Sequence, residues 1–159
     1  MKSEYIGNII LGDKAIVSDP SYNLDTECNK IIYDVLPGEY KCHVHKSNKK
    51  NVMYLSVTHI DTELPNIDDI FDLLEPISDD IGVDTAKCGI FDYEYFKQYI
   101  TDKELVHSAW DIRVAEIVGN SVISLSGFGD GTYIAWVRRN ENEDIDFICI
   151  DYVNEDPWY

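Results

Sequence analysis

The sequence predicts an α+β fold: a single domain of mostly antiparallel β-sheet, built from hairpins, with two to three short helices inserted in the middle. Three observations lead to this prediction. Apolar and polar side chains alternate through the first 60 residues and again through the last third of the chain. Helical spacing is confined to the stretch between them, and no Gly-, Ser- or Pro-rich linker divides the 159 residues. A chain of this length can bury its own core, so we expect residues 1–159 to form one acidic domain.

Alternation and turn residues locate the expected strands. The dipeptide Gly12-Asp13 predicts a tight turn after the first strand. The clearest hairpins join 39–46 to 52–60 and 132–138 to 145–152. The complete set of expected strands is 5–11, 14–18, 30–36, 39–46, 52–60, 82–91, 122–125, 132–138 and 145–152.

The stretch 61–84 is strongly acidic, with nine Asp or Glu residues and no Lys or Arg. Within it, apolar residues from Ile67 to Leu74 follow the spacing i, i+3, i+4, i+7, which predicts a short helix packed by one face. The acids off that stripe are expected to be exposed and to contact a partner. They are Asp68, Asp69 and Asp72.

Two further helices are expected after the acidic stretch. Asp92 is predicted to cap a helix whose apolar stripe runs through 93–100. Residues 101–104 (Thr-Asp-Lys-Glu) match a capping box and predict a third helix that continues to about Ala115. Gly119 is expected to end this helix as its C′ residue.

Two segments echo each other at a separation of 73 residues, 17–22 and 90–95. Each reads as a strand that ends in an aspartate, Asp19 or Asp92, with a tyrosine three residues later. Two matches in six residues also arise by chance. If the echo is a repeat, it marks equivalent strand ends, as in a duplicated hairpin unit.

The cysteines predict a reducing compartment. No two of the four are spaced as a C-x-x-C pair, and the first eight residues contain no apolar segment typical of a secretory leader. We therefore expect a cytoplasmic protein without disulfides. Cys42, Cys88 and Cys149 lie in apolar runs and are expected to be small buried residues.

The charge restricts the partners. With 30 acidic and 13 basic residues the formal net charge is −17, which argues against direct contact with nucleic acid phosphates or with an anionic membrane. Aromatic side chains among acids are typical of protein interfaces. A basic protein surface, such as that of a nucleic-acid-binding host protein, is therefore the expected partner, and the C-terminal Trp158 and Tyr159 are expected to contact it.

A glycine-rich segment, 126–133, offers an alternative. It precedes a strand rather than a helix and lacks the Lys-Ser/Thr pair of a phosphate-binding loop, so a turn with positive φ at Gly129 or Gly131 is the simpler expectation. In the alternative, the chain is a small enzyme or ligand-binding protein with a pocket at this loop. The pocket residues would be Asp19, Asp84, Gly129, Asp130 and Tyr133, although aspartates at strand ends are more often caps and turn residues.

The pair His43 and His45 has the spacing of two metal ligands on one face of a strand, and His59 could supply a third. Two histidines on the polar face of a hairpin are more often structural or solvated. We therefore expect no metal here, and no cofactor elsewhere in the chain.

Three motifs together resemble an uncharacterised domain-of-unknown-function family of small bacterial and phage proteins. They are 12–22 (GDKAIVSDPSY), 82–92 (GVDTAKCGIFD) and 127–133 (GFGDGTY), and they span nearly the whole chain. The resemblance implies a compact β-rich fold and carriage on mobile elements, but no assigned activity.

The expected function is that of a non-enzymatic acidic protein-binding module. The resemblance to phage proteins implies the setting: inhibition of a host defence or nucleic-acid-handling protein, or immunity against a toxin. The small enzyme or ligand-binding protein remains the alternative.

Overall fold

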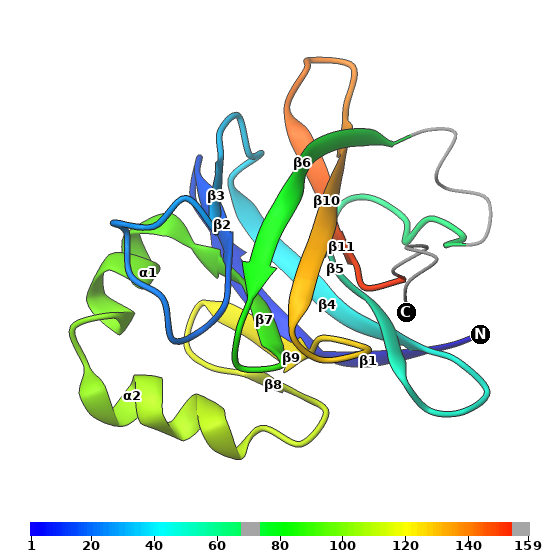
Figure 1. Cartoon of the computed structure of the whole chain (residues 1–159). Helices are drawn as coiled ribbons and strands as arrows, with labels where there is room; N and C mark the ends of the chain where they lie inside the picture. The colour runs from blue at the N-terminus through cyan, green and yellow to red at the C-terminus, as the bar shows by residue number, and fades with distance from the viewer. Residues whose placement is uncertain (68–73, 154–159) are drawn as a thin grey trace.

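Two antiparallel sheets lie face to face, with the helices on the outer side of the smaller sheet (Figure 1). The computed structural model describes residues 1–67 and 74–153. The larger sheet has six strands in the order β1 (Lys2–Leu11), β4 (Gly38–Lys46), β5 (Val52–His59), β11 (Ile145–Asp151), β10 (Gly131–Arg139) and β6 (Glu75–Val83). The smaller has five in the order β3 (Lys30–Ile32), β2 (Ala15–Ser18), β7 (Lys87–Asp92), β9 (Ser121–Leu125) and β8 (Ala115–Ile117).

The alternating apolar residues fill the space between the sheets. Val57 and Ile148 of the larger sheet and Val17 and Ile90 of the smaller sheet belong to this main core. The outer face of the smaller sheet is covered by α1 (Tyr93–Tyr99), α2 (Lys103–Ser108) and the 3₁₀ turn Ala109–Asp111. The α+β prediction with mostly antiparallel strands is confirmed.

The two halves of the chain follow the same path through the two sheets. In the first half, β1 forms an edge of the larger sheet, β2 and β3 pair in the smaller sheet, and β4 and β5 return to the larger. In the second half, β6, β7, β9, β10 and β11 follow the same path, with α1, α2 and β8 inserted between β7 and β9. An approximate two-fold rotation therefore relates the halves.

The strand registers obey this symmetry. A constant separation of 93 residues relates β4 to β10, and both strands open on glycine, Gly38 and Gly131. Ser56 of β5 lies opposite Cys149 of β11, its own counterpart at that separation. In the smaller sheet Val17 lies opposite Ile90, its counterpart at the separation of 73 residues that relates 17–22 to 90–95. The echo in the sequence is therefore confirmed as a pair of equivalent strand ends.

Two tyrosines make the same contact in the two halves. Tyr40, the third residue of β4, donates a hydrogen bond from its hydroxyl to the carbonyl oxygen of Leu36, four residues earlier. Tyr133, the third residue of β10, donates to the carbonyl of Gly129, again four residues earlier. The equivalence thus extends to side chains that tie each strand to its preceding loop.

The region 61–91 differs from the sequence-based expectation. The predicted strand 82–91 is two strands, β6 and β7, which the turn Asp84–Ala86 carries from one sheet to the other. Strand β6 begins already at Glu75, because it pairs with β10 along the edge of the larger sheet. The turn at Gly12 likewise passes between sheets, since β1 and β2 do not pair with each other. The predicted acidic helix lies largely outside the described residues.

The helices are shorter than expected. Asp92 caps α1 as predicted, by accepting a hydrogen bond from the amide of Tyr95. The prediction of a helix through Ala115 was wrong: α2 ends at Ser108, because the following chain turns to pair as β8 with β9. Gly119, with φ 55°, lies in the turn between these two strands and caps no helix. The strand expected over 30–36 is only the three residues of β3.

Candidate functional site

The turn Asp84–Ala86 between β6 and β7 brings three of the predicted pocket residues together. Asp19, which follows β2, accepts hydrogen bonds through Oδ2 from the amides of Asp84 and Thr85, at 2.8 and 2.9 Å. Asp130, which precedes β10, accepts one through Oδ1 from the amide of Ala86 at 2.8 Å. The aspartates therefore converge by organising a turn of the backbone.

Asp19 is fully buried and its carboxylate is saturated. Besides the two amides of the turn, Oδ1 accepts hydrogen bonds from the hydroxyl of Thr85 at 2.9 Å and from the amide and hydroxyl of Ser21 at 2.9 and 2.8 Å. Five donors occupy the roughly four lone-pair positions of a carboxylate, so Asp19 has no free position for a ligand. Its role is structural.

The symmetry of the fold supports this assignment. Asp92, the counterpart of Asp19 at the end of β7, accepts a hydrogen bond at 2.8 Å from the amide of Gly12, in the turn between β1 and β2. Each half thus places a carboxylate at the end of β2 or β7. There it accepts hydrogen bonds from the turn of the other half that passes between the sheets. This arrangement explains the aspartates of the sequence echo without a ligand.

Gly129 and Tyr133 of the predicted pocket close the loop before β10. Gly129 has φ 102°, which confirms the expected positive φ, and Gly127 has φ 56°. The buried hydroxyl of Tyr133 donates to the carbonyl oxygens of Ser126 and Gly129, at 2.8 and 2.6 Å. These contacts hold the loop against the strand, so Tyr133 does not present its hydroxyl to a ligand.

Two glycines of this loop allow a matched stability test. A Cβ at Gly129 would meet nothing within 4 Å, whereas a Cβ at Gly127 would lie 2.9 Å from the Cβ of Tyr152 and 3.0 Å from the carbonyl oxygen of Val52. We expect Gly129→Ala to lower the free energy of unfolding by about 1 kcal/mol through backbone strain alone. Gly127→Ala should cost about 2 kcal/mol or more, because backbone atoms cannot move aside. Urea denaturation measures both, and equal losses would contradict the packing shown at Gly127.

The outer side of this end of the molecule is acidic and aromatic. Asp84 and Asp130 are exposed, and Phe128, two residues before Asp130, is 58% exposed. Trp110, in the 3₁₀ turn after α2, is 60% exposed and lines a narrow depression together with Thr85. The end of α2, the β6–β7 turn and the β9–β10 loop lie together at the lower end of the molecule in Figure 1.

The pKa of Tyr22 reflects burial and the negative charge at this end of the molecule. Burial raises the pKa of its phenol to about 12, and the charges of Asp19, Asp84 and Asp130 add to the shift, as does the thiol of Cys28. A phenol with this pKa stays protonated at neutral pH and does not act as a base. The negative potential here favours a cationic partner instead.

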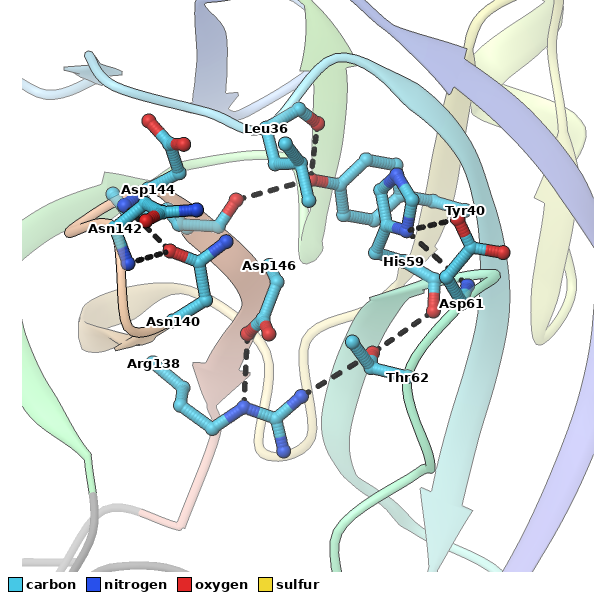
Figure 2. Close-up of polar contacts among 11 residues, drawn as sticks. Leu36, Tyr40, His59, Asp61, Thr62, Arg138, Asn140, Asn142, Asp144 and Asp146 are labelled. Carbon is cyan, nitrogen blue, oxygen red and sulfur yellow. Dashed lines mark hydrogen bonds and ion pairs between the residues drawn. The ribbon is translucent and has the colours of Figure 1, made fainter.

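A second polar cluster joins β10, β11 and the segment after β5 (Figure 2). Arg138 donates from Nε to Oδ1 of the buried Asp146 at 2.9 Å and from Nη2 to the hydroxyl of Thr62 at 3.4 Å. Nearby, Nδ1 of His59 accepts from the amide of Asp61, and Nε2 lies 3.3 Å from the carbonyl oxygen of Pro37. Both ring nitrogens are therefore engaged, and His59 serves the structure. The sequence does not predict this cluster, because the buried ion pair depends on the cross-strand register of β10 and β11.

One histidine of the pair His43 and His45 is structural. His45 is fully buried, with Nδ1 2.7 Å from the hydroxyl of Ser3 and Nε2 2.9 Å from the hydroxyl of Ser56. The prediction that these histidines are structural or solvated agrees with a structural role for His45, which is hydrogen-bonded to Ser3 of β1 and Ser56 of β5. Among residues 1–67 and 74–153, no three metal-ligating side chains gather around one point.

The cysteines match the expectation of burial. Cys42, Cys88 and Cys149 are fully buried free thiols. Burial raises the pKa of Cys42 to about 12, so this thiol stays protonated and unreactive at neutral pH. Cys28 is half-buried and also free.

The predicted partner-contact residues fall outside the described part of the chain. They are Asp68, Asp69, Asp72, Trp158 and Tyr159. Their role in binding stays a prediction.

Comparison of the chain with protein-family models, with curated proteins and with solved structures finds no match. The resemblance to a bacterial and phage family therefore stays a prediction. In the described residues, no helix has the length and apolar character needed to cross a membrane.

Proposed function

We propose that this protein is a non-enzymatic binding module that engages a basic surface of another protein in the bacterial cytoplasm. The observation that carries the proposal is that the aspartates differ in their hydrogen bonds and their exposure. Asp19 accepts five hydrogen bonds and Asp92 accepts from two backbone amides. Asp84 and Asp130 are exposed on an end that also exposes aromatic side chains, although Oδ1 of Asp130 accepts from the amide of Ala86. A catalytic site requires the opposite arrangement, with unsaturated titratable groups in a cavity.

The net charge of −17 supports a cationic partner. A one-signed field accelerates the encounter with a surface of opposite charge and rejects surfaces of like charge, including nucleic acid and anionic lipid. The phage-type resemblance supplies the setting that we propose: an inhibitor of a host defence or nucleic-acid-handling protein, or an immunity protein against a toxin.

The salt dependence of association tests this function. We expect the association rate with a polylysine peptide to fall at least about tenfold from low salt to about 0.3 M, because ions screen exposed charges beyond about 8 Å at physiological ionic strength. Stopped-flow fluorescence with a labelled peptide measures the rate, and an uncharged peptide of equal length is the control.

We expect a triple variant to associate more slowly without loss of stability, because the three side chains are predicted to be exposed. It combines Asp68→Asn, Asp69→Asn and Asp72→Asn. A rate that does not change with salt, or equal binding of the uncharged peptide, would mean that the charge serves only solubility.

A further inference from the structure

The two halves of the fold provide an internal comparison. Where the second half keeps a residue of the first at an equivalent position, the fold itself accounts for it, as for Tyr40 and Tyr133. Where the second half departs from the first at an exposed position, the fold alone does not require the new residue. Three such departures lie at the end formed by the β6–β7 turn and the β9–β10 loop.

The first departure is Phe128. It lies three residues before the glycine that opens β10, and the residue three before the glycine that opens β4 is Val35. Val35 is 2% exposed and belongs to the main core, whereas Phe128 is 58% exposed. The fold can therefore bury an aliphatic side chain at this position, yet the second half directs an aromatic side chain to solvent.

The other departures are two acids. Asp84 donates its amide to Asp19 as Gly12 donates its amide to Asp92, so glycine suffices at this place in the turn. Asp130 directly precedes the opening glycine of β10, where Pro37 precedes that of β4. The path of the chain does not require a carboxylate at residue 84. The carboxylate of Asp130 is exposed at its surface, and its Oδ1 also accepts from the amide of Ala86.

A fourth residue comes from the insertion that the first half lacks. Trp110 follows α2, and it lines a depression with Thr85 and Lys87, so it borders the same turn. Two exposed aromatic side chains and two exposed carboxylates thus share one end of the molecule, and all four are specific to the second half.

We propose that Trp110, Phe128, Asp84 and Asp130 form a docking surface for arginine side chains of a basic partner, an inference that rests on the proposed function. Charge complementarity selects a cationic occupant. The planar guanidinium group stacks on aromatic rings and pairs with carboxylates in a fork geometry, and the lysine ammonium group lacks this combination. The surface therefore discriminates arginine from lysine at equal charge.

The test compares a polyarginine with a polylysine peptide of equal length, by isothermal titration calorimetry on the full chain. We expect the wild type to bind polyarginine about threefold to fivefold more tightly, as cation–π contacts at exposed sites imply. Phe128→Ser combined with Trp110→Ser should bring the two affinities together while polylysine still binds. Tyr33→Ser is the matched control, because Tyr33 is 59% exposed but lies in the first half.

The outcomes separate this surface from the proposed function. Two results would overturn the proposed docking surface but leave the acidic binding function standing, provided that both peptides bind. One is an unchanged preference for polyarginine in the variant Phe128→Ser with Trp110→Ser. The other is loss of that preference in Tyr33→Ser. If neither peptide binds the wild type at low salt, both the docking surface and the proposed function are overturned. Phe128→Ser alone should reduce the preference in part, which keeps the test decisive if the double variant does not fold.

Discussion

Replacing Asp19 by alanine is expected to lower the free energy of unfolding by about 3 kcal/mol or more. The substitution removes the acceptor of five hydrogen bonds from a fully buried position, and it leaves the amides of Asp84 and Thr85 without a partner. A hydrogen bond to a charged group contributes about 1.5–3 kcal/mol. Urea denaturation measures the loss.

Two matched variants accompany it. Asp84→Ala, in the same turn but with an exposed side chain, should change stability by less than about 0.5 kcal/mol. Asp92→Ala removes the counterpart of Asp19. Among the described residues, the carboxylate of Asp92 accepts from two amides, those of Gly12 and Tyr95, so a loss of about 1–2 kcal/mol is expected. A loss below about 1 kcal/mol for Asp19→Ala would refute its structural role.

The second large effect concerns acid stability. Burial, with a smaller contribution from the charge of His43, lowers the pKa of His45 from 6.5 to about 4. Because the unfolded chain binds the proton more tightly, the contribution of His45 to stability is complete above pH 6.5 and is lost as the pH falls towards 4. The shift corresponds to about 3 kcal/mol over this window.

The variant His45→Gln isolates this effect. It should show a shallower loss of stability than the wild type between pH 6.5 and 4, as measured by urea denaturation at each pH. His107→Gln, in which an exposed histidine is replaced, should follow the wild-type curve. Parallel curves for the wild type and His45→Gln would show that His45 is not held neutral.

Local patterns were sufficient for much of the fold. Strong alternation predicted β4, β5, β10 and β11 within one residue at each end, because these strands bury one face on the main core. The cap at Asp92 was predictable from a single polar residue before an apolar stripe. The echo around Asp19 and Asp92 indicated the duplication, since the same residue type performs the same task at both strand ends.

Long-range pairing explains the errors. The first six residues of β6, 75–80, bury no side chain and include three acids, so no local pattern marks this part of the strand. It forms because β6 pairs with β10. The capping-box segment continues in helical spacing, but pairing with β9 turns 115–117 into β8. The role of Asp19 depends on a turn 65 residues away in the sequence. The exposure of Phe128 becomes informative only by comparison with the buried Val35 at the equivalent position of the first half.

The most direct test of the central claim, that a basic partner docks on the second-half end of the molecule, is a residue-level map of binding. Amide chemical shifts of the full chain would be followed by NMR during titration with the polyarginine peptide. We predict that the shifts concentrate in the turn Asp84–Ala86, the 3₁₀ turn Ala109–Asp111 and the loop Ser126–Asp130. Shifts spread over all acidic segments, or concentrated in the first half, would contradict the claim.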